Sequence, residues 1–91
     1  MKNKANILIV DDEIEMTETL SDILTALGHH VEIANDGYTA IEKVKAQLFD
    51  VILMDIKMPA MNGVETYKKI KQIQTKATVM MMTAYSVEEL V

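Results

Sequence analysis

The stretch of sequence that decides the fold is Ile7-Leu8-Ile9-Val10-Asp11-Asp12. It belongs to an apolar run from Ala5 to Val10 that is rich in branched side chains and stops at two acidic residues. A strand buried on both faces of a parallel sheet has this continuous apolar pattern, whereas a strand with one solvent-exposed face alternates apolar and polar residues. We therefore expect a buried strand at 5–10 that leads directly into an acidic loop. The run is too short for a signal peptide or a membrane span.

The rest of the chain alternates helical patterns with further short apolar runs. Strands are expected at 30–34, 51–54 and 77–82, and helices over 14–27, 40–48 and 64–73. Gly28 stands where glycine commonly closes a helix, and Asp12 with Glu15 is a candidate capping pair for the first helix. Short loops and right-handed crossovers then predict an α/β fold, a doubly wound parallel sheet with helices on both faces.

Composition excludes several classes of protein. The chain has 91 residues, 49% of them apolar and 25% charged, which predicts one small packed domain over 1–91. Its net charge of −5, without a basic stripe, disfavours direct binding to nucleic acid. It has no Cys and two adjacent His, which disfavours thiol chemistry and a histidine-built metal centre. We expect a cytoplasmic protein with no membrane segment.

Acidic residues and one threonine follow the predicted strands. Asp11 and Asp12 follow the first strand, Asp55 the third and Thr83 the fourth. The carboxyl ends of parallel strands share one edge, where functional residues gather, although Asp12 alone could equally cap a helix. Two charges about 4 Å apart repel by roughly 4 kcal/mol at an effective dielectric near 20, so such a cluster needs a cation or a proton. With oxygen ligands only, the expected ion is Mg²⁺, and a site of this kind suits phosphoryl chemistry.

Four motifs in combination resemble the receiver domain of bacterial two-component response regulators. They are Ile7–Glu13, Val51–Pro59, Asn62-Gly63 and Met82–Tyr85. The resemblance implies a flavodoxin-like sheet, here of order 2-1-3-4, with the family's fifth strand and last helix absent. The chain would be an incomplete receiver domain that ends in the first turn of the fourth helix, at the capping box Ser86–Glu89.

The resemblance also implies a role for each acidic residue. Asp55 would be the phosphoacceptor, taking a phosphoryl group from a histidine kinase or a phosphotransfer protein. Asp12 would bind Mg²⁺ directly and Asp11 mainly through water. Asp55 itself and the backbone carbonyl of Lys57 would complete the protein ligands.

The switch residues are likewise implied by the resemblance. The Thr83 hydroxyl and the Ala84 N–H would bind the phosphoryl group, and the side chains of Lys57 and Tyr85 would tune its hydrolysis. The catalytic Lys of the family is absent from this chain, which would leave the phosphorylated site near −2. The module would not be an enzyme beyond self-catalysed phosphotransfer and dephosphorylation.

An alternative function is association. An incomplete receiver that is not phosphorylation-competent could pair through the edge strand at 78–82, which carries no charge, and form a homo-oligomer or a strand-exchanged dimer. A phosphatase with an aspartyl nucleophile is disfavoured, because Asp55 lacks the second Asp two residues on. Lys68, Lys69 and Lys71 could attract an acidic partner, with a solvated helix face as the simpler interpretation. Asn35-Asp36-Gly37 is interpreted as a turn only.

Overall fold

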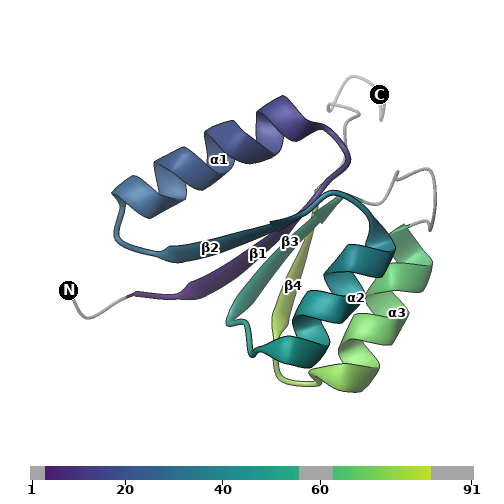
Figure 1. Cartoon of the computed structure of the whole chain (residues 1–91). Coiled ribbons are helices and arrows are strands. Elements are labelled where there is room, and N and C mark those ends of the chain that lie inside the picture. Colours follow the sequence, from purple (N-terminus) through teal and green to yellow (C-terminus); the bar gives the residue numbers. More distant parts are fainter. Residues whose placement is uncertain (1–3, 56–62, 83–91) are drawn as a thin grey trace, which may run out of the picture.

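The computed structural model describes residues 4–55 and 63–82, which form a four-stranded sheet with helices on both faces (Figure 1). In chain order the elements are β1 (Asn6–Val10), α1 (Ile14–Ala26), β2 (His30–Ala34), α2 (Gly37–Ala46), β3 (Val51–Asp55), α3 (Gly63–Ile73) and β4 (Thr78–Met82). Every pair of neighbouring strands is parallel, in the order β2-β1-β3-β4. The predicted α/β fold and strand order are confirmed. The expected turn at 86–89 lies outside the described residues.

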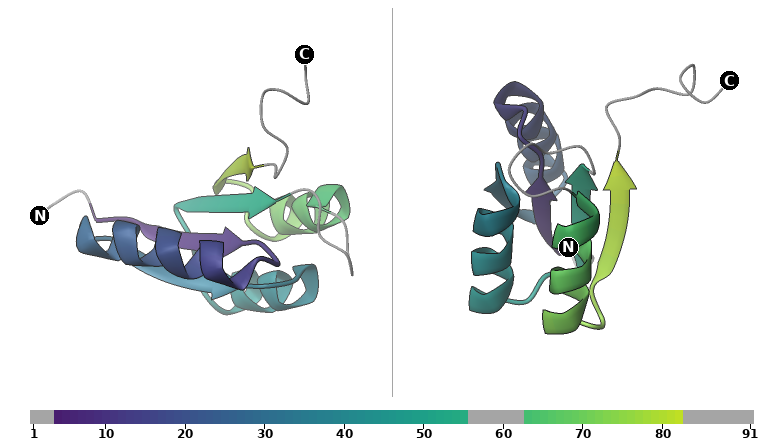
Figure 2. Two further views of the ribbon diagram at one scale, coloured as in Figure 1. Left: turned by 90° about the horizontal axis from the view of Figure 1, so that it is seen from above. Right: turned by 90° about the vertical axis from the view of Figure 1, so that its right-hand side faces the viewer.

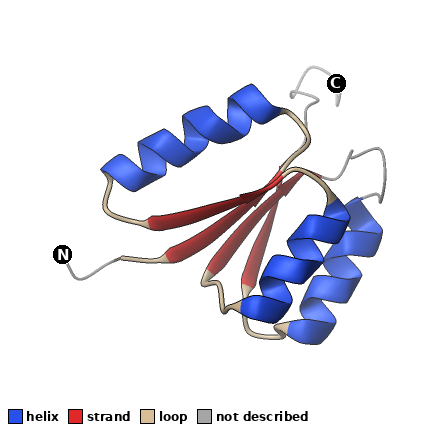
Figure 3. Cartoon of the chain, viewed as in Figure 1, coloured by secondary structure: helices blue, strands red, loops and turns tan. Residues whose placement is uncertain are grey.

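The sheet separates two unequal helical layers. α1 covers one face by itself, and α2 and α3 lie side by side on the other (Figure 2, Figure 3). β1 is buried on both faces, as its continuous apolar pattern predicts: Leu8 and Val10 belong to the core beneath α2 and α3, and Ile7 and Ile9 alternate with them toward α1. Among the described helices, none combines the length and the apolar character that a bilayer span requires.

The glycine Gly28 ends α1. Gly28 has a φ of 100°, a conformation that L side chains rarely adopt. Its N–H donates to the Thr25 carbonyl at 2.9 Å, and the His29 N–H donates to the Leu24 carbonyl at 3.1 Å. This pair of hydrogen bonds is the Schellman motif, which satisfies carbonyls that the helix end leaves without a donor. The predicted helix end at Gly28 is confirmed.

Two details of the predicted helices are wrong. Leu48, the last residue of the predicted second helix, lies beyond α2 and is 77% exposed. The helix at 64–73 is predicted from an apolar stripe with a spacing of three, and this stripe is only partly buried; it consists of Val64, Tyr67, Ile70 and Ile73. Val64 is 51% exposed, whereas Thr66, which the stripe omits, is fully buried with Ile70. A spacing of three rotates the stripe by about 60° at each step, because an α-helix has 3.6 residues per turn. A spacing of four keeps Thr66 and Ile70 on the same face.

A buried glutamine joins the ends of α2 and α3. The Gln74 side-chain amide donates to the Val44 carbonyl at 2.8 Å and to the Gln47 carbonyl at 2.6 Å. Its carbonyl oxygen accepts from the Phe49 N–H at 3.0 Å. Gln74 is 7% exposed, and it satisfies three backbone groups in the last turn of α2 and in its connection to β3.

We predict that Gln74→Ala lowers the free energy of unfolding by about 2–4 kcal/mol. The variant leaves three backbone groups without partners, and a buried unsatisfied group costs about 1–3 kcal/mol. Urea denaturation measures the change. Gln72→Ala removes an exposed amide near the end of α3; it is the matched control and should change stability by less than about 0.5 kcal/mol. Equal stabilities of the two variants would contradict this role of Gln74.

Candidate functional site

Three carboxylates meet at the carboxyl edge of the sheet. One oxygen from each of Asp11, Asp12 and Asp55 lies within 4.8 Å of the others. β1 and β3 are neighbours, and Val10 pairs with Met54 in their register. The residues that follow this pair are Asp11 and Asp55, so the register itself sets them next to each other. The structure thus brings together the acidic residues that the sequence singled out.

The turn after β1 explains how two consecutive aspartates share one site. β1 ends at Val10, and the Asp11 N–H extends its pairing by donating to the Ala34 carbonyl at 3.0 Å. One Asp11 carboxylate oxygen then accepts from the Glu13 N–H at 2.9 Å, which bends the chain into the loop. The strand alternation that would send Asp11 and Asp12 to opposite faces has therefore ended.

The predicted capping pair of Asp12 and Glu15 is wrong. Glu13 occupies the N-cap position of α1, and no side chain caps the helix there. The nearby Glu13 N–H is taken by Asp11 instead. Asp12 is exposed and remains directed to the carboxylate cluster rather than to the helix.

Burial and the nearby negative charges both raise the pKa of the Asp11 carboxyl. Asp11 and Asp55 are each 3% exposed, whereas Asp12 is exposed. Loss of hydration raises the pKa of the Asp11 carboxyl above its ordinary value, and the charges of Asp55 and Asp12 raise it further. The hydrogen bond from the Glu13 N–H lowers the pKa but does not outweigh these causes. The cluster therefore favours a proton or a cation among its carboxylates.

Asn35 supports the site in a way that the sequence interpretation missed. Its side-chain amide donates to the Asp11 carbonyl at 2.8 Å and lies 3.4 Å from the Thr17 hydroxyl oxygen. The buried Thr17 hydroxyl donates in turn to the Ile14 carbonyl at 2.7 Å. The interpretation of Asn35 as a turn residue only is therefore wrong. The position of Asn35 directly after β2, at the same edge of the sheet as Asp11, is the sequence feature that could have indicated this contact.

The donor set fits a hard divalent cation. The three side chains offer only carboxylate oxygens, the ligands that Mg²⁺ prefers. The three oxygens lie within 4.8 Å of one another, so these residues would hold one such cation between them, and water would complete its shell.

The other site residues predicted from the sequence fall outside the described ranges. These are Lys57, Thr83, Ala84 and Tyr85. The last described residue before Thr83 is Met82, which is the register partner of Asp55.

The chain is similar to parts of several curated proteins. It is 43% identical over 83 residues to the transcriptional regulatory protein ZraR of Klebsiella oxytoca, covering 91% of this chain and 19% of that protein. It is 42% identical over 80 residues to the transcriptional regulatory protein CpxR homolog of Haemophilus influenzae, covering 88% and 34%. The chain thus spans about a fifth of the length of the ZraR relative and about a third of the CpxR homolog.

Solved structures share the fold. The response regulator receiver domain protein (CheY-like) of Methanospirillum hungatei has a TM-score of 0.88 and 32% identity, covering 96% of this chain and 70% of that one. The response regulator protein TrrA of Thermotoga maritima, in complex with Mg(2+)-BeF, has a TM-score of 0.82 and 33% identity, covering 89% and 70%. The predicted flavodoxin-like fold is confirmed by these CheY-like neighbours.

The family that the motifs indicated is also the family that matches the chain as a whole. The model of the response regulator receiver domain matches residues 7–91, which include the carboxylate cluster and all seven described elements except the first residue of β1. The chain belongs to the response regulator receiver domain family.

Proposed function

We propose that this chain is a phosphoacceptor module of two-component signalling in which Asp55 takes a phosphoryl group from a histidine kinase or a phosphotransfer protein. In this step the bond from phosphorus to the donor's imidazole nitrogen breaks, and a bond to an Asp55 carboxylate oxygen forms. The observation that carries the proposal is the position of Asp55 at the end of β3, with carboxylate oxygens of Asp11 and Asp12 within 4.8 Å. Membership of the receiver family supports it.

Asp11 and Asp12 hold the cation that the transfer needs. Mg²⁺, when bound, neutralises phosphoryl oxygens and so lowers the repulsion between the acceptor and the incoming group. Asp12 is exposed and suits direct ligation, whereas the buried Asp11 already accepts a hydrogen bond and suits ligation through water. Asp55 and the Lys57 carbonyl are the other proposed ligands. The TrrA structure, which is a complex with Mg(2+)-BeF, supports the choice of Mg²⁺ as the ion.

Thr83 is the proposed switch. Its hydroxyl and the Ala84 N–H would bind the phosphoryl group on Asp55, and Lys57 and Tyr85 would tune the rate of hydrolysis. The register supports this arrangement, because Met82, the residue before Thr83, pairs with Asp55. Binding of the phosphoryl group then changes the surface to which a partner protein binds.

The association alternative has less support than signalling. The comparisons favour a receiver domain of response regulators. Homo-oligomerisation through β4 stays a prediction, which rests on Met80 and Met81: they are 54% and 46% exposed on a strand that pairs only with β3 among the described strands.

Incubation with Mg²⁺ and acetyl phosphate is predicted to give one phosphoryl adduct per chain. Intact-mass spectrometry measures it. Asp55→Asn should give no adduct, because the amide is not a nucleophile of comparable strength. Asp22→Asn, an exposed position on α1, is the matched control and should give the adduct of the parent. The absence of an adduct on folded parent protein would overturn the proposal.

Asp11→Asn is predicted to stabilise the metal-free protein by about 1–3 kcal/mol. The substitution removes one of three close charges, and the amide oxygen can still accept from the Glu13 N–H. Added Mg²⁺ should raise the melting temperature of the parent by mass action but raise that of the variant much less. Asp22→Asn should behave as the parent in both respects. A variant less stable than the parent without Mg²⁺ would contradict the repulsion described here.

A dependence on pH follows from the raised pKa of Asp11. A carboxyl whose pKa is higher in the folded protein favours folding when protonated, so its contribution is fully present below its unfolded pKa and is lost as the pH rises through its folded pKa. Because protons compete with the cation, Mg²⁺ affinity should rise over that same pH window. Calorimetric titrations across this window measure the affinity. Asp11→Asn should show a flatter dependence, and an equal slope in parent and variant would assign the titration to other groups.

A further inference from the structure

The two faces of the sheet carry helices of opposite charge. α1 has three acidic residues, Glu15, Glu18 and Asp22, and no lysine. On the other face, α2 and α3 hold five of the chain's nine basic residues against two acidic ones, Glu42 and Glu65. The five basic residues are Lys43, Lys45, Lys68, Lys69 and Lys71. In a chain with a net charge of −5, this is the face that attracts an acidic molecule.

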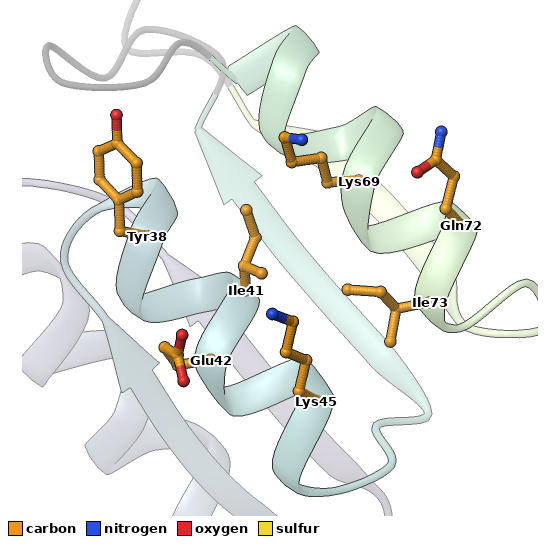
Figure 4. A pocket seen from close by; sticks show the side chains of 7 residues that line it. All are labelled: Tyr38, Ile41, Glu42, Lys45, Lys69, Gln72 and Ile73. Carbon is orange, nitrogen blue, oxygen red and sulfur yellow. The ribbon is translucent and has the colours of Figure 1, made fainter.

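A groove of about 370 Å³ lies between α2 and α3 on this basic face (Figure 4). Ile41 and Ile73 point into the space between the two helices, and Tyr38 stands at one end. Ile41 is half-buried, whereas Ile73 and Tyr38 are 40% and 59% exposed. The groove therefore presents apolar surface to solvent, and covering that surface is favourable.

Two lysines flank the apolar surface of the groove. Lys45 of α2 and Lys69 of α3 are exposed lining residues. The ion pairs among the described residues are His30–Glu32 and Lys43–Glu32, so neither lysine is paired with a described carboxylate. One acidic side chain, Glu42, also lines the groove, and Figure 4 shows it directed away from the gap between the helices. The groove thus combines an apolar floor with two available positive charges.

We propose that the groove between α2 and α3 docks an acidic amphipathic helix of a partner protein. Apolar side chains of that helix cover Ile41 and Ile73, and its carboxylates pair with Lys45 and Lys69. Charge complementarity selects this occupant, since the remainder of the chain repels acidic molecules and this face attracts them. The docking does not rest on phosphorylation of Asp55, because no residue of the carboxylate cluster lines the groove.

The probe that tests this proposal is a fluorescein-labelled synthetic helix with leucines at spacings of three and four, flanked by glutamates. Fluorescence anisotropy with the full chain should show binding that weakens as salt is added. The same peptide with lysines in place of the glutamates should not bind. Lys45→Glu combined with Lys69→Glu should weaken binding at least about tenfold, equivalent to about 1.4 kcal/mol. The matched pair Lys68→Glu and Lys76→Glu, exposed residues outside the groove, should weaken it less than about threefold.

Methyl NMR spectra locate the bound peptide. The signals of Ile41 and Ile73 should shift on addition of the acidic peptide, and those of Ile7 and Ile9 beneath α1 should not. Equal loss of binding in the two charge-reversed pairs, or unmoved Ile41 and Ile73 signals, would overturn the proposal. Concentration-dependent shifts at these methyls without peptide would assign the groove to a second copy of the chain. Binding to phosphatidylserine vesicles without binding to the peptide would assign this face to a membrane surface, and either result overturns the proposed partner.

Discussion

Mutual repulsion among three carboxylates is the constraint that the rest of this structure must accommodate. Asp11 and Asp55 are almost fully buried beside the charge of Asp12, so the metal-free protein retains an unfavourable interaction at the carboxyl edge of its sheet. The buried packing of β1 and β3 offsets this unfavourable interaction. β1 is buried on both faces, and Ile52 and Met54 of β3 are fully buried, so the backbone cannot move the acidic side chains apart without breaking the core. The packing thus keeps a cation-binding arrangement in place before any cation binds.

The loops around the cluster form one hydrogen-bonded unit rather than independent turns. The Asp11 carboxylate fixes the Glu13 N–H, and the Asn35 amide fixes the Asp11 carbonyl, so the segments after β1 and β2 hold each other. The next residue, Asp36, caps α2 by accepting from the Thr39 N–H at 2.7 Å. Asp11 is therefore connected to the start of α2 by two hydrogen bonds and the peptide bond between Asn35 and Asp36. This connection makes Asn35 a positioning residue of the acidic site, although it contributes no carboxylate to it.

The sequence predicted those parts of the molecule that depend on local pattern. Continuous apolar runs predicted the strands, and the rule that parallel strands share a carboxyl edge was enough to predict that Asp11, Asp12 and Asp55 lie together. The parts that it missed depend on contacts between residues distant in the chain. Asn35 contacts residues 24 and 18 positions away, and Gln74 contacts backbone groups 25 to 30 positions away. A buried polar side chain leaves no mark in hydrophobic periodicity. For the same reason the sequence did not indicate that Thr66 is buried on α3, where part of the apolar stripe is exposed to solvent.

The acidic cluster and the groove between α2 and α3 have no lining residue in common. The core offers a mechanical connection between them. Val44 of α2 and Ile70 of α3 pack in one cluster with Ile52 and Met54, and Met54 immediately precedes Asp55. A ligand that shifts the spacing of the two helices, or a phosphoryl group that shifts the end of β3, acts on the same buried side chains. Coupling of the two sites through this core requires that the core has two distinct packings.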